Sequence, residues 1–297
     1  MSLVSLAKVG KENEIRKAIE ESLGLIQYKF TKGIKKIVIK PNMCYYWDFT
    51  TGHTTDPRFV ATLIDLIHDQ ISTNVEISVV ETDASAMKCK YVFRMLGYEK
   101  MVQNYDNVQL VNLSEDEGEE VKVTVKDHTL SFTLPKTISD ADLRINVPKI
   151  KYMSLTKISC ALKNIYGCNP YPEKFRYHKN LDKVIVGLNK IMHFDLAILD
   201  GIIVSGTTPR KLDLVMSSQD PVAFDAIASK IAGVNPKSVR HITLAHEEGL
   251  GTLTFTSKGV NPKSFEKSFP KPSLTSKVLV SAYKLAIKTG LLSSDMM

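Results

Sequence analysis

The sequence predicts an α/β protein with a mainly parallel, mixed central sheet and helices on both faces. Short apolar runs such as KKIVIKPN and VEISVVETD end in polar residues, as buried strands commonly do. Amphipathic segments such as PRFVATLIDLIHDQ alternate with these runs, and this order is typical of parallel strands joined by helices. With 297 residues, 43% of them hydrophobic, the chain is long enough to bury a core without disulfides.

The alternation holds along most of the chain. In its first part we expect a helix over residues 11–27, a strand over 35–42, a helix with Pro57 at its first position and a strand over 75–83. The elements expected later are the strand ADLRINVPK, a helix with Ser154 as its N-cap, a helix over about 179–193, the strands DLAILDG and LDLVMSSQ, the helix PVAFDAIASKIAG with Asp220 as its N-cap, and the helix VRHITLAHEEGLG.

The middle and the end of the chain depart from this alternation. The runs VQLVNL, VKVTVKD and TLSFTLP predict a small antiparallel excursion over about residues 108–135. From residue 257 the composition changes to Pro, Lys and Ser, which predicts an α/β domain over 1–256 and a basic linker with an amphipathic helix over 257–297. That helix, at about 273–292, either docks on the domain or lies on a membrane surface.

Composition argues against several classes of protein. No window of about 18 residues is continuously apolar, and the N-terminus has no signal-peptide pattern, so we expect neither a transmembrane helix nor secretion. The four cysteines form no C-x-x-C pair, which argues against an iron–sulfur cluster. Walker and G-x-G-x-x-G patterns are also absent, so no dinucleotide is expected. We therefore expect a cytoplasmic protein with reduced cysteines, and the sequence does not define its oligomeric state.

The net charge of +7 is concentrated in two segments. Residues 144–190 contain ten Lys and Arg against two acidic residues, and residues 257–297 contain seven lysines against two. The rest of the chain is net acidic. A surface that binds nucleic acid usually spreads its basic residues or interleaves them with aromatic side chains. The pattern therefore favours a local site for a small anion, with nucleic-acid binding as the alternative.

Polar residues follow nearly every predicted strand. Because the carboxyl ends of parallel strands meet at one edge of a sheet, where ligands bind in such folds, we expect these residues to share a crevice. The five sets are Lys40–Asn42, Glu81–Asp83, Asn146–Lys149, Asp200–Gly201 and Ser217–Asp220.

The stretch Asn146–Cys168 contains four lysines and no acidic residue. Val147 precedes a proline and is therefore expected to be extended, and a helix from Ser154 would place Leu155 and Leu162 against the core. Two lysines would then lie just before the helix N-terminus, where free N–H groups attract anions. The residues expected to bind the anion are Lys149, Lys151, Lys157, Lys163, Asn42 and Asn146.

Three residues are candidates for acid–base catalysis. His178 lies among cations that would lower its pKa and keep it neutral. Asp225 lies among apolar neighbours, and Lys40 ends a buried strand. An alternative hypothesis places His53 and Glu81 on a metal ion. The residues expected to orient the ligand are Asp56, Asp83 and Asp200.

The strand ends, taken in order, resemble an uncharacterised family, the domain of unknown function numbered 362. The resemblance is carried by IKPN, TTDPRFVATLIDLI, VVETDAS, ADLRINVPKIKYMSLTKISCALKNIYGC, HKN, ILDGI, GTTP, SSQDPVAFDAIA and EEGLG, between residue 35 and about 256. Some members of that family carry four-cysteine inserts and are labelled iron–sulfur proteins, and this chain lacks such an insert. The pattern is also distantly similar to the N-terminal domain of the nickel-pincer lactate racemase family. That similarity implies small carboxylate or phosphate substrates and acid–base chemistry by lysine or histidine.

From the sequence we therefore expect an enzyme that acts on a small anionic metabolite. Two other classes stay open, because the same residues would serve them. One is an RNA-associated accessory protein that uses the basic surface, and the other is a carrier of a metal or cofactor that uses His53 and the carboxylates.

Overall fold

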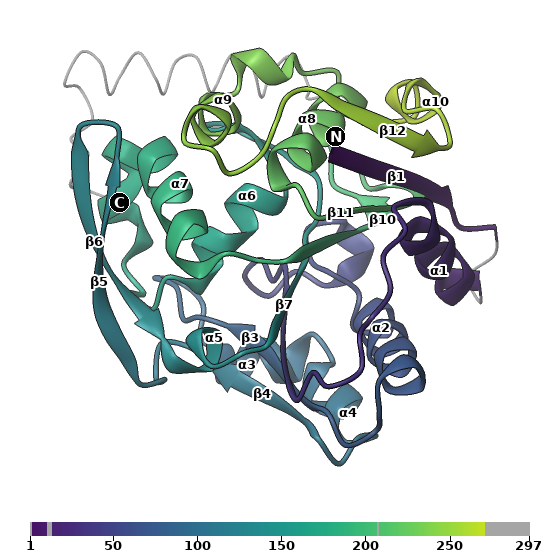
Figure 1. Cartoon of the computed structure of the whole chain (residues 1–297), viewed down its shortest axis with the longest axis horizontal. Helices are drawn as coiled ribbons and strands as arrows, with labels where there is room; N and C mark the ends of the chain where they lie inside the picture. The colour runs from purple at the N-terminus through teal and green to yellow at the C-terminus, as the bar shows by residue number, and fades with distance from the viewer. Residues whose placement is uncertain (1, 11–13, 207, 271–297) are drawn as a thin grey trace.

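The computed structural model describes residues 2–10, 14–206 and 208–270. At its centre lies an eight-stranded sheet of order β12-β1-β11-β10-β7-β2-β3-β4 (Figure 1). Its strands are β1 (Ser2–Lys8), β2 (Lys36–Pro41), β3 (Glu76–Glu81), β4 (Val108–Asn112), β7 (Leu143–Val147), β10 (Leu196–Val204), β11 (Arg210–Ser218) and β12 (Phe255–Gly259).

The sheet is mixed because β11 runs against its neighbours. It pairs antiparallel with both β1 and β10, whereas the remaining neighbours in the sheet pair in parallel. The side chains of β2 pack on both faces of the sheet. Ile37 and Ile39 belong to one core cluster, and Val38 belongs to the other. The predicted fold class, a mainly parallel mixed sheet with helices on both faces, is confirmed.

Helices cover each face of the sheet (Figure 1). The helices that contribute to one core cluster are α1 (Ile15–Leu25), α2 (Pro57–Gln70), α3 (Cys89–Met95) and α4 (Tyr98–Val102). Those that contribute to the other are α5 (Lys136–Ser139), α6 (Ala161–Asn164), α7 (Leu181–Met192), α8 (Pro221–Ile231), α9 (Arg240–Glu247) and α10 (Lys263–Glu266). Two predicted helix starts are confirmed, because the side chains of Asp56 and Asp220 accept from backbone N–H groups of α2 and α8, each with proline next.

The antiparallel excursion is a hairpin of β5 (Gly118–Val125) and β6 (His128–Pro135), which packs against α7 at one side of the molecule (Figure 1). The expectation that VQLVNL belongs to it is wrong. That segment forms β4, which pairs in parallel with β3 at the edge of the main sheet. The apolar run of VQLVNL is compatible with a strand in the hairpin or in the main sheet. Its partner is decided by the free hydrogen-bonding groups of β3, a strand distant from the hairpin in the sequence.

The prediction of a helix that begins at Ser154 is also wrong. A second hairpin, β8 (Lys151–Met153) and β9 (Lys157–Ser159), occupies this position, and α6 begins only at Ala161. Leu155, expected in the core, lies in the hairpin turn with 43% of its surface exposed. The residues that do pack inward after it are Ile158, Leu162 and Ile165. These three positions have the spacing of one helical face, but Ile158 lies on a strand and Leu162 lies on the short helix that follows it.

The two ends of the chain add to the sheet. β1, which the sequence did not predict, pairs with β11 and β12. The boundary expected at residue 257 falls within β12, where Val4 pairs with Ser257. The helix expected at about 273–292 lies outside the described residues. Within the described part of the chain, no helix has the length and apolar character needed to cross a membrane.

The segment after residue 257 contributes to stability through Phe265 of α10, which is 4% exposed and belongs to the core cluster of α6–α9. Truncating it leaves a cavity, so Phe265→Ala is expected to lower the free energy of unfolding by about 3 kcal/mol in urea titrations. The control is Lys263→Ala on the same helix, which removes a surface side chain and should cost less than about 0.5 kcal/mol. Equal, small effects of both changes would show that this segment does not belong to the domain.

Candidate functional site

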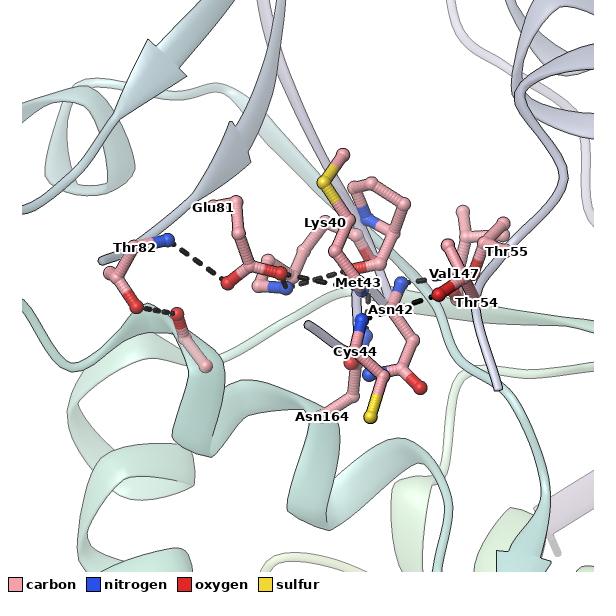
Figure 2. A network of polar contacts seen from close by, with 12 residues as sticks. Lys40, Asn42, Met43, Cys44, Thr54, Thr55, Glu81, Thr82, Val147 and Asn164 are labelled. Atoms are coloured by element: carbon pink, nitrogen blue, oxygen red, sulfur yellow. Dashed lines mark hydrogen bonds and ion pairs between the residues drawn. The ribbon is translucent and has the colours of Figure 1, made fainter. Parts of the chain in front are cut away.

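Four of the five polar strand ends meet at one edge of the sheet. The parallel register pairs Lys40 with Asn146, and the Asp200 N–H donates to the carbonyl of Pro148 at 3.2 Å. The side chains of Lys40 and Glu81 join the ends of β2 and β3 (Figure 2). The fifth set, Ser217–Asp220, lies at the opposite edge, because β11 is antiparallel and its Ser218 pairs with Ala197 at the start of β10. The other four sets therefore lie together without it.

Five lysines gather at this edge, and we call Lys40, Lys149, Lys151, Lys163 and Lys174 the lysine cluster. Two of them have carboxylate partners that are themselves buried. The Nζ of Lys40 lies 2.8 Å from Glu81 Oε2, and the Nζ of Lys149 lies 3.1 Å from Asp200 Oδ2. A buried charge is tolerated only when it is paired and hydrogen bonded, so these two ion pairs fix the geometry of the strand ends.

The other three lysines have no carboxylate within 4.0 Å among the described residues. Lys151 donates to the His53 carbonyl at 3.0 Å and lies close enough to the Cys44 side chain for the thiol to affect its pKa. Lys174 donates to the Asn169 carbonyl at 3.0 Å and to the Thr82 hydroxyl. Lys163 Nζ lies 5.4 Å from the centre of the Tyr166 ring, a cation–π contact. The lysine cluster therefore holds three cations in excess of its carboxylates.

This excess charge has electrostatic consequences. Burial, and then the charge of Lys151, lowers the pKa of Lys163 to about 8. Burial likewise lowers the pKa of Lys174 to about 8, although Glu81 acts in the opposite direction. Lys151 is 5% exposed, and its pKa is also lowered, chiefly by burial. Each shift means that the fold disfavours the charged ammonium, so this edge of the sheet would gain from a bound negative charge.

Two histidines respond to the same field. Burial, followed by the charges of Lys151 and Lys149, lowers the pKa of His53 to about 4. His178 is exposed, and its pKa is lowered by partial desolvation of its ring and then by the charge of Lys163. Both rings are therefore neutral at pH 7 and able to accept a proton.

Asn42 and Asn164 lie close to Lys40 (Figure 2), and the side chain of Asn164 connects two strand ends. The Nδ2 of Asn164 donates to the Lys40 carbonyl at 3.1 Å and to Asn146 Oδ1 at 2.8 Å. The backbone N–H of Asn42 donates to the Thr55 hydroxyl at 2.9 Å. The buried oxygens Asn42 Oδ1 and Asn164 Oδ1 have no hydrogen-bond partner in the described residues. Buried polar atoms are nearly always paired, so these two acceptors are exceptions within the polar network.

Gly167 lets a helix end approach the Lys40–Glu81 pair. A Cβ at this position would lie 3.1 Å from Lys40 Cε and 3.2 Å from Glu81 Oε1. Its carbonyl accepts from the Thr82 hydroxyl at 2.7 Å. The segment that follows α6 therefore covers the ion pair at van der Waals distance, and the absence of a side chain at 167 makes this possible.

The carboxylate side chains predicted for the site accept hydrogen bonds from backbone N–H groups. Asp56 caps α2, and its own N–H donates to Asp200 Oδ2 at 2.9 Å. Asp83 accepts from the Cys89 N–H at 2.9 Å at the start of α3. Asp225 is fully buried and accepts from the N–H of Ala161 at 2.7 Å, and burial raises its pKa to about 7. These residues position the elements around the site.

The remaining expectations concern Lys157 as an anion-binding residue and His53 with Glu81 as metal ligands. Lys157 is exposed, and its Nζ donates to the Ser238 carbonyl at 2.7 Å, so the structure does not bring it to the lysine cluster. Glu81, a weak candidate metal ligand with His53, is already engaged by Lys40. Within the described residues, no three His, Cys, Asp or Glu side chains lie together so that they could hold a metal ion.

Sequence reasoning missed several residues of this site. Lys174 was counted in the basic block but not assigned to the site, because it follows a loop whose path the sequence does not define. Cys44 was considered only as a cysteine, although its position two residues after Asn42 at a strand end was a usable signal. Asn164 was expected on the side of the helix opposite the apolar residues, but the structure buries its amide in a polar network with Asn146 and the Lys40 carbonyl.

A cavity of about 130 Å³ is lined by both members of the Lys149–Asp200 pair and by Asp56. Its charged side chains are already paired with one another, Arg58 with Asp56 and Lys211 with Asp213. The unpaired cations of the lysine cluster, rather than this cavity, therefore define the candidate site.

The fold and the site define an α/β protein with a polar site at the carboxyl ends of parallel strands. The chain belongs to the family described as domain of unknown function (DUF362), which matches residues 37–230. It is 30% identical over 160 residues to a thylakoid-associated protein of Synechocystis, a match that covers 50% of this chain and 47% of that protein. The chain thus spans about half the length of this relative. Among solved structures, the lactate racemase apoprotein from Thermoanaerobacterium thermosaccharolyticum is similar, with a TM-score of 0.46 and 10% identity over 79% of this chain and 58% of that one.

The depressed pKa of His53 offers a direct probe of the charge excess. Lys151→Met removes one of the cations that disfavour its protonation, so the pKa of His53 is expected to rise from about 4 toward its ordinary value of 6.5. The measurement is the imidazole titration by NMR, assigned with His53→Gln. Lys157→Met, which removes an exposed lysine from the same block, is the control and should leave the titration unchanged. An unchanged midpoint in Lys151→Met would contradict the proximity of these charges.

The Lys40–Glu81 pair should be costly to break. Glu81→Gln leaves the buried Lys40 ammonium without a counter-charge, and the free energy of unfolding is expected to fall by about 3–5 kcal/mol. The matched control is Glu99→Gln, whose carboxylate pairs with Arg94 at 3.2 Å on the surface and should contribute less than about 1 kcal/mol. Chemical denaturation of both variants at neutral pH measures the difference, and comparable losses would refute the role given to the buried pair.

Proposed function

We propose that the lysine cluster binds a small anion, a carboxylate or a phosphate, and that the protein is an enzyme acting on the molecule that carries it. The observation that supports this proposal best is that Lys151, Lys163 and Lys174 share one edge of the sheet without a carboxylate partner among the described residues. Unpaired buried cations lower stability, and an anion held by charge-assisted hydrogen bonds would offset that cost.

The same geometry supports acid–base chemistry. Lys163, whose pKa is lowered to about 8, is close enough to neutrality to give up and take back a proton at physiological pH. His178 is neutral at pH 7 and lies within the field of Lys163. Lys40, the other proton carrier considered from the sequence, is engaged by Glu81 and by the Pro41 carbonyl at 2.6 Å. We therefore propose His178 and Lys163 as the proton carriers.

Nucleic-acid binding is the less well supported alternative. Lysines that bind a polyanion backbone need to be accessible along its length, and they supply a salt-dependent affinity. The cations that lack partners here are instead buried or partly buried at the strand ends. Such a site fits one or two anionic groups of a small molecule.

Thermal unfolding with and without ligand tests the proposal. Inorganic phosphate and small carboxylates such as acetate are expected to raise the Tm of the wild type, since a ligand at 100 times its Kd stabilises the fold by about 2.7 kcal/mol. Lys163→Met should lose this response. Lys179→Met, an exposed lysine of the same block, should keep it. Equal responses in the wild type and Lys163→Met would refute the site.

Two further readouts separate a binding site from a structural one. The folded state disfavours charged Lys163, so the free energy of unfolding should rise as pH increases from about 8 to 10.5. For the same reason, Lys163→Met should be more stable than the wild type by about 1–2 kcal/mol at pH 7 without ligand.

Cys44 is partly exposed, whereas Cys89, Cys160 and Cys168 are buried. Alkylation of Cys44, beside Lys151, should therefore slow when phosphate is bound.

A further inference from the structure

Exposed aromatic side chains lie in the two loops that border the lysine cluster. Tyr45, Tyr46 and Trp47 are 45%, 36% and 48% exposed, and Tyr171 and Phe175 are 44% and 39% exposed. Single exposed apolar residues need no explanation, but a group of them around one site marks a surface that contacts something.

The first loop, residues 44–53, is tied to the cluster at both ends. The Cys44 side chain lies near Lys151 and affects its pKa, and the His53 carbonyl accepts from the same ammonium at 3.0 Å. The Trp47 ring lies 4.7 Å from the His53 ring, between centres. Tyr45 in turn contacts Trp47 edge-on at 5.8 Å. A chain of direct contacts therefore leads from the unpaired cation to the exposed aromatic faces.

The loop is held in place by its own hydrogen bonds. The Thr54 hydroxyl donates to the Trp47 carbonyl at 2.6 Å and accepts from the Cys44 N–H at 3.3 Å. Gly52, at φ +71°, packs so closely on the end of β10 that a Cβ would lie 2.3 Å from the Val204 carbonyl carbon. The aromatic side chains are thus exposed on a fixed backbone rather than on a loose one.

The second loop places aromatic side chains on either side of Lys174. Tyr171 and Phe175 flank this lysine in the sequence, and its Nζ reaches into the cluster. Arg176 lies 6.0 Å from the centre of the Tyr171 ring and adds a cation at the rim. Exposed aromatic side chains therefore lie in both loops, and in the second loop a cation accompanies them.

Resting on the function proposed above, we propose that the ligand of the lysine cluster is a small anion that carries a planar ring. The lysines would hold its carboxylate or phosphate group, and Trp47 would contact the ring. Aromatic side chains bind planar groups by stacking, and the nearby positive charges are complementary to the acidic group of the same molecule. Single-stranded nucleic acid also combines rings with phosphates, but its backbone would need accessible cations, and Lys151 is 5% exposed.

Two pairs of probes test this inference by calorimetry: phenyl phosphate against inorganic phosphate, and benzoate against cyclohexanecarboxylate, which is apolar but not planar. The wild type is expected to bind the planar member of each pair at least about fivefold tighter, the effect of one modest stacking contact. Trp47→Leu should lose this preference while still binding inorganic phosphate. Tyr91→Leu, which removes another aromatic residue that is 47% exposed, should keep it. Because Trp47 is the single tryptophan of the chain, its fluorescence should change with phenyl phosphate in both the wild type and Tyr91→Leu.

The outcomes separate this inference from the function on which it rests. If phosphate binds but phenyl phosphate binds no tighter, or if Trp47→Leu keeps the preference, the ring contact is refuted and the anion site stands. If no anion binds, and Lys163→Met behaves as the wild type does, the proposed function itself fails. If a single-stranded oligonucleotide binds more tightly than phenyl phosphate, with an affinity that falls steeply with salt, the ligand is nucleic acid and the small-molecule inference is overturned.

Discussion

The buried ion pair of Lys40 and Glu81 organises the carboxyl edge of the sheet. Taking two charges out of water is costly, so they must meet with good geometry, and this requirement fixes the ends of β2 and β3 relative to each other. Other elements then attach to the pair. Asn164 hydrogen bonds the Lys40 carbonyl, and Gly167 brings the segment after α6 against both side chains. The position of Lys163, next to Asn164, depends on these contacts.

Around this pair the protein tolerates charges that it does not neutralise itself. Lys149 has Asp200, but the partners of Lys151, Lys163 and Lys174 among the described residues are carbonyl or hydroxyl oxygens and an aromatic ring. A fold selected for stability alone would replace such cations, because each one disfavours the native state. These cations lie at the carboxyl ends of parallel strands, where α/β sheets bind ligands, and this position is the reason for placing the proposed anion site there.

Much of the fold could be predicted from the sequence, whereas the site could be predicted only in part. Asp56–Pro57 and Asp220–Pro221 start helices by local hydrogen bonds and a fixed φ angle, so neither needs the rest of the chain. Leu155, in contrast, fitted a helical stripe and lies in a hairpin turn, because β8 and β9 pair with each other. Strand pairing is a contact between separate segments, and the spacing of apolar residues does not specify it.

The sequence by itself determined the alternation of strands and helices, the concentration of lysines between residues 144 and 190 and the polar character of the strand ends, because these follow from residue type and local spacing. Only the tertiary structure decided which lysines have partners. The antiparallel direction of β11 takes Ser217–Asp220 away from the site, and a loop brings Lys174 into it. Lys157 and Lys163 are six residues apart in one basic stretch, yet one donates to a surface carbonyl and the other lies in the cluster. Whether a charge is solvated, paired or unpaired depends on segments distant in the chain.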